Sequence, residues 1–158
     1  MDEKSSALFV FFLDDRILAF PLDVVIQALF SVEVTPLPAS PDIIAGVINY
    51  HGEIVPVVDL RVRFGSHRQE ILTSDRFILI RTEKRVLVVV ASGVTGVLKP
   101  SGAIPSAANI LPGARYISGM LPDDLHLILI YDTEAFLSLE EDIALDAALG
   151  DFEGEEVL

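Results

Sequence analysis

Residues 46–59 read GVINYHGEIVPVVD, two short apolar runs on either side of a polar turn. Valine and isoleucine favour strands, and the polar stretch around Gly52 favours a turn, so the sequence predicts strands over 44–49 and 53–58. Asp59 follows directly and can cap a helical turn over 59–64, which Gly65 can end. The expected unit is a hairpin followed by a short capped helical turn.

The same unit recurs 73 residues later. Placing Gly46 on Gly119 aligns 46–48 with 119–121, 54–57 with 127–130, and Asp59 with Asp132, without a gap. A second, weaker sequence match aligns 16–18 with 85–87 and Val25 with Val94. A repeated supersecondary unit predicts two related halves in one chain. We therefore expect a mainly β fold of two barrels with about five strands each.

The rest of the chain fits this pattern. Further strands are expected over 7–13, 16–20, 33–37, 77–81, 86–90, 94–98, 117–121 and 125–131. Many are continuously apolar, which is typical of strands that are covered on both faces or lie in a small closed barrel. Segments 36–41 and 100–112, rich in proline or glycine, are expected to be loops. Capping-box spacing at Ser138 predicts a C-terminal helix that Gly150 ends. We expect a single domain over 1–150 and an acidic tail over 151–158.

Composition excludes several classes of protein. The 158 residues are 51% apolar, too many for a disordered chain, and the formal net charge is −13. All 11 basic side chains lie before residue 116, whereas 12 of the 24 acidic ones lie after it. This negative charge opposes binding to nucleic acid, whose phosphate backbone is also negative. The absence of cysteine, of a basic leader and of a long apolar span predicts a cytoplasmic protein without membrane insertion.

Catalytic motifs are absent from the sequence. It contains no phosphate-binding loop, no dinucleotide fingerprint and no Gly-x-Ser-x-Gly nucleophile elbow. One imidazole and two carboxylates, His51, Glu53 and Asp59, leave open a small β-barrel hydrolase or ligand-binding protein. The other interpretation is a turn with a polar tip and a helix cap. We expect no catalytic residue, cofactor or metal, and no enzymatic activity.

Segments 20–25 (FPLDVV), 35–38 (TPLP) and 46–61 (GVINYHGEIVPVVDLR) resemble the CheW-like domain of bacterial chemotaxis. The resemblance extends over nearly the whole chain, including 138–148, which is similar to the C-terminal helix of free-standing members. It implies two intertwined SH3-like five-stranded β-barrels with short helices and a C-terminal helix. It also implies a non-enzymatic scaffold that couples the cytoplasmic tip of a chemoreceptor to a CheA-type histidine kinase.

The chain departs from the family pattern at its turn. Members typically carry Asn-Leu-Arg-Gly where this chain has 49–52, NYHG, and that arginine belongs to the receptor-facing region. Histidine is smaller than arginine and exchanges a proton near neutral pH. Members also often carry an acid at the positions of Gln27 and Ser92. The residues expected to contact partners are Val25, Gln27, Asn49, Tyr50, His51 and Gly52.

Overall fold

The computed structural model describes residues 7–102, 104, 116–124 and 126–157, with side chains as far as residue 153. Strands are the commonest regular element of the described chain, with two short 3₁₀ helices and one α-helix. In chain order the elements are β1 (Leu8–Leu13), β2 (Arg16–Pro21), η2 (Leu22–Val24), β3 (Val25–Phe30), β4 (Ile44–Tyr50), β5 (Glu53–Val58), η3 (Leu60–Phe64), β6 (Arg76–Arg81), β7 (Val86–Ala91), β8 (Gly93–Leu98), β9 (Ile117–Asp123), β10 (His126–Tyr131) and α1 (Leu139–Val157).

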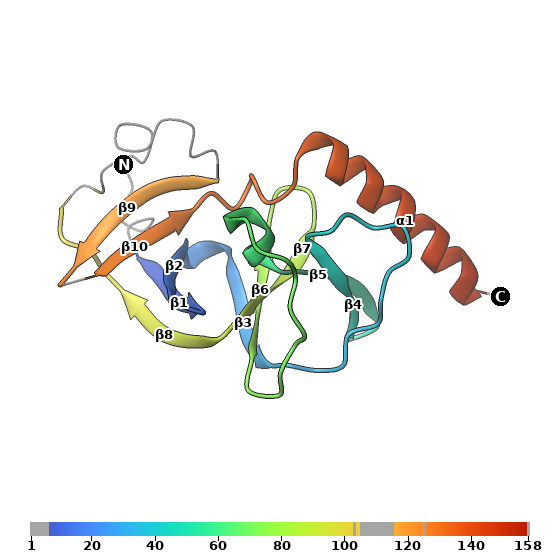
Figure 1. Ribbon diagram of the computed structural model, residues 1–158, viewed down its shortest axis with the longest axis horizontal. Coiled ribbons are helices and arrows are strands. Elements are labelled where there is room, and N and C mark those ends of the chain that lie inside the picture. The colour runs from blue at the N-terminus through green and yellow to red at the C-terminus, as the bar shows by residue number, and fades with distance from the viewer. Residues whose placement is uncertain (1–6, 103, 105–115, 125, 158) are drawn as a thin grey trace.

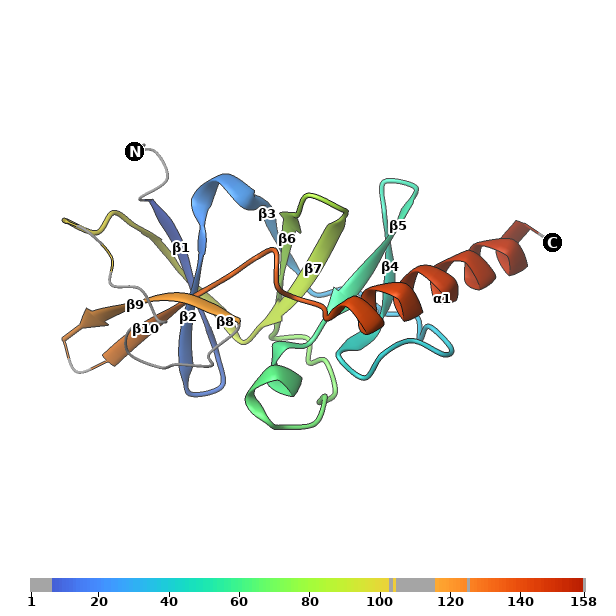
Figure 2. The same cartoon turned by 90° about the horizontal axis from the view of Figure 1, so that it is seen from above.

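The strands form two five-stranded sheets that exchange strands. The first has the order β8-β1-β2-β10-β9 and the second has the order β3-β6-β7-β5-β4. After β2 the chain therefore leaves the first sheet to place β3 in the second, and after β7 it returns with β8. Figures 1 and 2 show the two sheets side by side along the long axis, the first on the left and the second on the right. The predicted mainly β fold of two intertwined barrels is confirmed.

The hairpin repeat is present residue by residue. Gly46 pairs with Val57 in the β4–β5 hairpin, and Gly119 pairs with Ile130 in the β9–β10 hairpin. Both hairpins have a register shift beside this pair, so the bulge repeats as well. The two hairpins therefore share one register, as the alignment of Gly46 with Gly119 predicted.

The weaker sequence match also joins residues in equivalent strands of the two sheets. Val25 of β3 pairs with Ile80 of β6, and its counterpart Val94 of β8 pairs with Phe11 of β1. The two exchanged strands thus occupy equivalent edges of the two sheets.

The structure around β3 differs from the sequence-based prediction. The strand expected over 33–37 is wrong: only Thr35 pairs there, in an isolated bridge with Val47. The strand β3 was not predicted, because most of its residues are exposed and it shows no alternating apolar face. The bridge carries two backbone hydrogen bonds of 2.9 and 2.8 Å between Thr35 and Val47, and it connects the β4 edge to the segment leaving β3. The second sheet closes into a barrel in this way.

Successive residues of a strand point to opposite faces of the sheet, so their apolar side chains pack into different cores. In β1, Leu8 and Val10 belong to the interior of the first barrel, whereas Phe9 and Phe11 belong to the large core shared by both barrels and α1. Strand β6 divides in the same way between the second barrel and the shared core. The continuously apolar strands are therefore covered on both faces, as expected.

The helix α1 begins with the predicted capping box. The Ser138 hydroxyl accepts from the Glu141 amide at 3.1 Å, and the Glu141 carboxylate accepts from the Ser138 amide at 2.8 Å. The predicted end at Gly150 is wrong, because α1 continues to Val157 and includes most of the expected tail. The reason is the apolar spacing of Leu145, Ala148 and Phe152, which pack against the shared core on both sides of Gly150.

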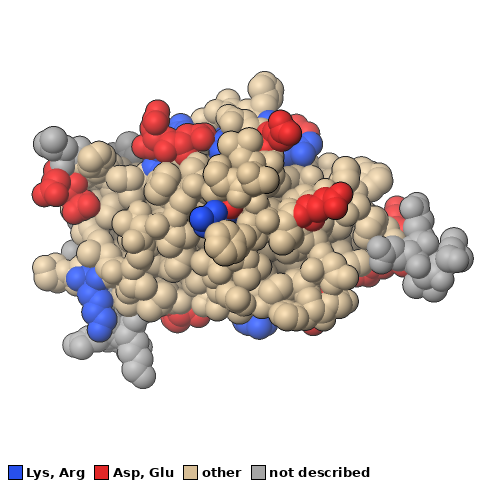
Figure 3. Space-filling model, turned by 90° about the horizontal axis from the view of Figure 1, so that it is seen from below, with Lys and Arg blue, Asp and Glu red and all other residues tan. Residues whose placement is uncertain are grey.

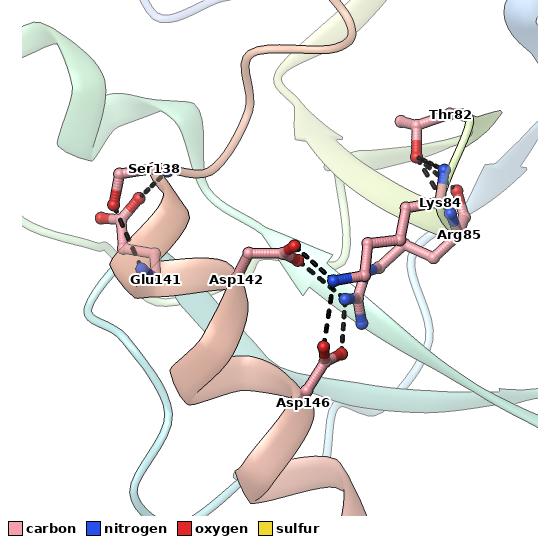
Figure 4. A network of polar contacts seen from close by, with 7 residues as sticks. All are labelled: Thr82, Lys84, Arg85, Ser138, Glu141, Asp142 and Asp146. Carbon is pink, nitrogen blue, oxygen red and sulfur yellow. Dashed lines mark hydrogen bonds and ion pairs between the residues drawn. The ribbon is translucent and has the colours of Figure 1, made fainter.

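Ion pairs attach α1 to the turn between β6 and β7 (Figure 4). Asp142 and Asp146 each pair with both Lys84 and Arg85, at 2.5 to 3.0 Å. At the start of the helix Arg63 pairs with Glu141. The basic residues of the first part of the chain thus neutralise one side of the acidic helix.

Replacing Gly150 with alanine is expected to stabilise the protein by about 0.5–1 kcal/mol, because glycine in a helix interior loses more backbone entropy on folding. A Cβ atom at this position meets nothing within 4 Å. Urea denaturation of the two proteins measures the difference. A loss of stability in the variant contradicts the helical assignment at this residue.

Stability is expected to fall as the pH is lowered below about 4. Hydrogen bonds from Arg85 and Lys84 lower the pKa of Asp146. At Glu141 burial raises the pKa, but hydrogen bonds from Arg63 and Ser138 outweigh burial and hold the pKa below its usual value. A lowered pKa in the folded state contributes stability above the unfolded-state pKa, and this stability is lost as the carboxylate takes up its proton.

The melting temperature between pH 6 and pH 3 measures this effect. The variant Asp146→Asn is the control, because it lacks one of these carboxylates and its melting temperature should therefore change less with pH. Equal pH dependence of the two proteins contradicts the assignment to Asp146.

No helix of the described part is both long enough and apolar enough to cross a membrane. The loop expected over 100–112, and residue 125 of the strand expected over 125–131, fall largely or wholly outside the described residues.

Candidate functional site

The turn between β4 and β5 is a tight two-residue turn. Tyr50 pairs with Glu53, so only His51 and Gly52 form the loop, and their φ angles are +52° and +88°. Positive φ at both positions is what a hairpin turn of type I′ requires. The Asn49 side chain accepts a hydrogen bond from the Gly52 amide at 2.8 Å. The turn is therefore held in one conformation by its own side chain.

A hydrogen bond connects this turn to the opposite edge of the same sheet. The Tyr50 hydroxyl donates to Gln27 Oε1 at 2.8 Å, and the two residues come from β4 and β3, the two edge strands. The Tyr50 ring meets the His51 ring edge to face, with centroids 4.3 Å apart. Gln27, Asn49, His51 and Gly52 are exposed, and Tyr50 is half-buried. Five of the six expected partner-binding residues therefore lie in one small surface.

Val25 lies apart from this surface. It is half-buried at the start of β3 and packs against the shared core. Its contacts favour core packing instead of the expected partner contact.

The three residues of the hydrolase or ligand-binding alternative do not converge. Glu53 and Asp59 lie at opposite ends of the six-residue strand β5, and His51 lies in the turn beyond Glu53. Asp59 is buried and accepts hydrogen bonds from the Arg61 amide and guanidinium. Among the described residues no group of three His, Asp or Glu side chains is placed to hold a metal ion.

A second surface displays large apolar side chains near the end of β3. Phe30, Val32 and Leu72 are 71%, 50% and 55% exposed. The Arg76 guanidinium lies 4.5 Å from the centre of the Phe30 ring, and the Ser31 hydroxyl donates to the Leu72 carbonyl. Figure 3 shows a face of the molecule on which uncharged side chains predominate. Exposed apolar groups held in place by local contacts are typical of a protein interaction surface.

Local sequence patterns do not reveal which residues meet the hairpin from elsewhere in the chain. A cavity of about 320 Å³ beside the turn is lined by Asn49, Gly52 and Ile54 of the hairpin, by Glu33, and by Phe152 of α1. Phe152 was placed in the acidic tail. The helical spacing of Leu145, Ala148, Leu149 and Phe152 was the signal that could have found it.

Comparisons with known proteins agree with this architecture. A family model described as a CheW-like domain matches residues 7–141. The chain is 31% identical over 118 residues to the chemotaxis protein CheW of Klebsiella aerogenes, covering 72% of this chain and 70% of the relative. It is 27% identical over 136 residues to CheW of Thermotoga maritima, covering 85% and 89%. Protein FrzA of Myxococcus xanthus is 35% identical over 104 residues, covering 66% and 62%.

A solved structure has the same fold. The crystal structure of the scaffolding protein TtCheW from Thermoanaerobacter tengcongensis matches with a TM-score of 0.75 at 22% sequence identity. The match covers 87% of this chain and 95% of that one.

Proposed function

The chain belongs to the CheW-like domain family, and from this we propose that it is a non-enzymatic adaptor coupling chemoreceptors to a CheA-type histidine kinase in the cytoplasm. The family match over residues 7–141 carries this proposal. The region 1–150 acts as one CheW-like domain. The kinase supplies the phosphoryl chemistry, and the adaptor couples two binding equilibria, so that the state of a receptor alters the geometry of the kinase.

The receptor contact is assigned to the turn surface, defined as Gln27, Asn49, Tyr50, His51 and Gly52. The bonds of Tyr50 to Gln27 and of Gly52 to Asn49 support this choice, because a preorganised turn loses little entropy when it binds. Val25 is left out of this surface because it packs against the shared core.

The kinase contact is assigned to the apolar surface of Phe30, Val32 and Leu72. An adaptor needs a second surface besides its receptor contact, and these three exposed residues share no member with the turn surface. Their exposed apolar area supports a docking role.

The variant His51→Arg tests the receptor contact. Arginine carries a permanent charge and five N–H donors, whereas an imidazole is smaller and offers fewer donors. We therefore expect the variant to bind the receptor fragment roughly three- to tenfold more tightly than the native protein does.

Titration calorimetry with a fragment of the receptor tip, with kinase binding measured in parallel, checks both parts of the proposal. Equal affinities of the two proteins contradict the contact at residue 51. Weaker binding by the variant shows that the receptor fits histidine by shape instead of charge. A native protein that binds neither partner contradicts the adaptor function itself.

A further inference from the structure

The cavity beside the turn is built from three separate parts of the chain. The hairpin contributes Asn49, Gly52 and Ile54, the segment after β3 contributes Glu33, and α1 contributes Phe152. Figures 1 and 2 show α1 running beside β4 and β5 in both views. The cavity of about 320 Å³ therefore opens between the turn surface and the last turns of the helix.

The apolar walls of this cavity are fixed by the core. Ile54 and Phe152 are both half-buried, and both pack against the shared core of the two barrels and α1. The capping box at Ser138 and the ion pairs of Asp142 and Asp146 hold the same helix at its other end. The cavity therefore has rigid walls before any partner binds.

The lining of the cavity carries a negative charge. Glu33 lines it, and no lysine or arginine of the described residues does. The Glu33 carboxylate is exposed and takes part in none of the ion pairs found among the described residues.

We infer that this cavity receives an arginine side chain of the partner that binds the turn surface, an inference that rests on the proposed adaptor function. The guanidinium stacks on the Phe152 ring, and its parallel N–H groups donate to the Glu33 carboxylate. The methylene stem packs against Ile54 while the charged group stays at the acidic rim.

Other side chains fit this cavity less well. An acidic side chain meets the like charge of Glu33, and this costs binding energy. A purely apolar side chain removes water from Glu33 and gives it no partner. Lysine satisfies the charge but lacks the planar group that stacks on an aromatic ring and binds a carboxylate through two bonds.

Two capped tripeptides test the inference on the full chain. The first is acetyl-Ala-Arg-Ala-amide, and the second carries citrulline, the uncharged counterpart of arginine. In NMR titrations we expect the arginine peptide to shift the amide signals of Gly52 and Phe152, and to bind at least fivefold more tightly than the citrulline peptide. Added salt should reduce this preference.

Three variants assign the effect to the cavity. Glu33→Gln keeps the shape of an exposed side chain and should remove most of the preference for arginine. Phe152→Leu keeps an apolar side chain against the core but removes the aromatic ring, and should weaken binding of the arginine peptide at least threefold. The control Glu140→Gln removes an exposed carboxylate at the first turn of α1, far along the helix from Phe152, and should leave both affinities unchanged.

Equal binding of the two peptides, or a preference for arginine that Glu33→Gln does not reduce, overturns the inference. A bridging experiment with receptor fragment and kinase separates this result from the proposed function. If the native protein bridges the two partners and Glu33→Gln bridges them equally well, the cavity inference alone is wrong. If the native protein binds the arginine peptide at the cavity but bridges nothing, the adaptor function alone is wrong.

Discussion

Replacing Arg61 with methionine is expected to lower the free energy of unfolding by about 3–5 kcal/mol, because it leaves a buried carboxylate without its partner. The Arg61 side chain is 6% exposed and pairs with Asp59, which is 1% exposed, at 3.2 Å. It also donates to both oxygens of Asp14, at 2.7 and 3.1 Å. The hydrogen bond from Arg61 lowers the pKa of Asp14, as expected for a carboxylate in a stable ion pair.

This ion pair connects the two barrels. Asp14 lies in the turn between β1 and β2 of the first sheet, whereas Asp59 follows β5 of the second. Chemical denaturation of Arg61→Met measures the loss, and Arg68→Met is the matched control because Arg68 is exposed. Arg61→Lys should recover only part of the stability, since an ammonium group cannot reproduce the paired N–H groups that bind Asp14. A loss no greater than that of the control contradicts a structural role for this ion pair.

Replacing Gly46 with alanine is expected to destabilise the protein by about 2–4 kcal/mol, through backbone strain and steric overlap together. Its φ angle is +152°, at the bulge of β4. A Cβ atom there lies 2.3 Å from the Thr35 carbonyl oxygen and 2.6 Å from a methyl group of Val34. The substitution therefore pushes away the segment whose bridge from Thr35 to Val47 closes the second barrel.

The control for this experiment is Gly52→Ala. Gly52 also has a positive φ angle, +88°, but a Cβ atom there meets nothing within 4 Å. It should cost only about 1 kcal/mol, from backbone strain alone. Denaturation of both variants isolates the effect of the close approach at Gly46. Equal losses in the two variants contradict the assignment of that effect to steric overlap.

Local sequence features determined much of this fold. The hairpin at 46–59, the Asp59 cap, the Gly65 stop and the Ser138 capping box depend on residues within a few positions of one another. Hydrogen bonds and turn preferences at that range depend little on the rest of the molecule. The repeat that aligns Gly46 with Gly119 could be predicted as well, because it preserves the local pattern of a whole hairpin.

Sequence patterns failed where local preference and tertiary packing disagree. β3 is an exposed edge strand, so its side chains carry no alternating pattern, and its pairing with β6 becomes apparent only in the folded sheet. Gly150 has the local character of a helix stop, yet the packing of Phe152 against the core favours continuation by more than the roughly 1 kcal/mol that a glycine costs.

The sequence by itself determined the β class of this protein, its two related halves, its family resemblance and the turn on which the candidate site is centred. Only the tertiary structure decided which distant residues meet that turn. Gln27 reaches Tyr50 because the barrel brings together the two edges of one sheet. Glu33 lies beside the turn because the bridge from Thr35 to Val47 holds its segment against β4, and Phe152 lies there because α1 packs against the shared core. The residues that meet at the turn come from separate elements, and their geometry follows from chain topology and burial of the shared core, which no local pattern specifies.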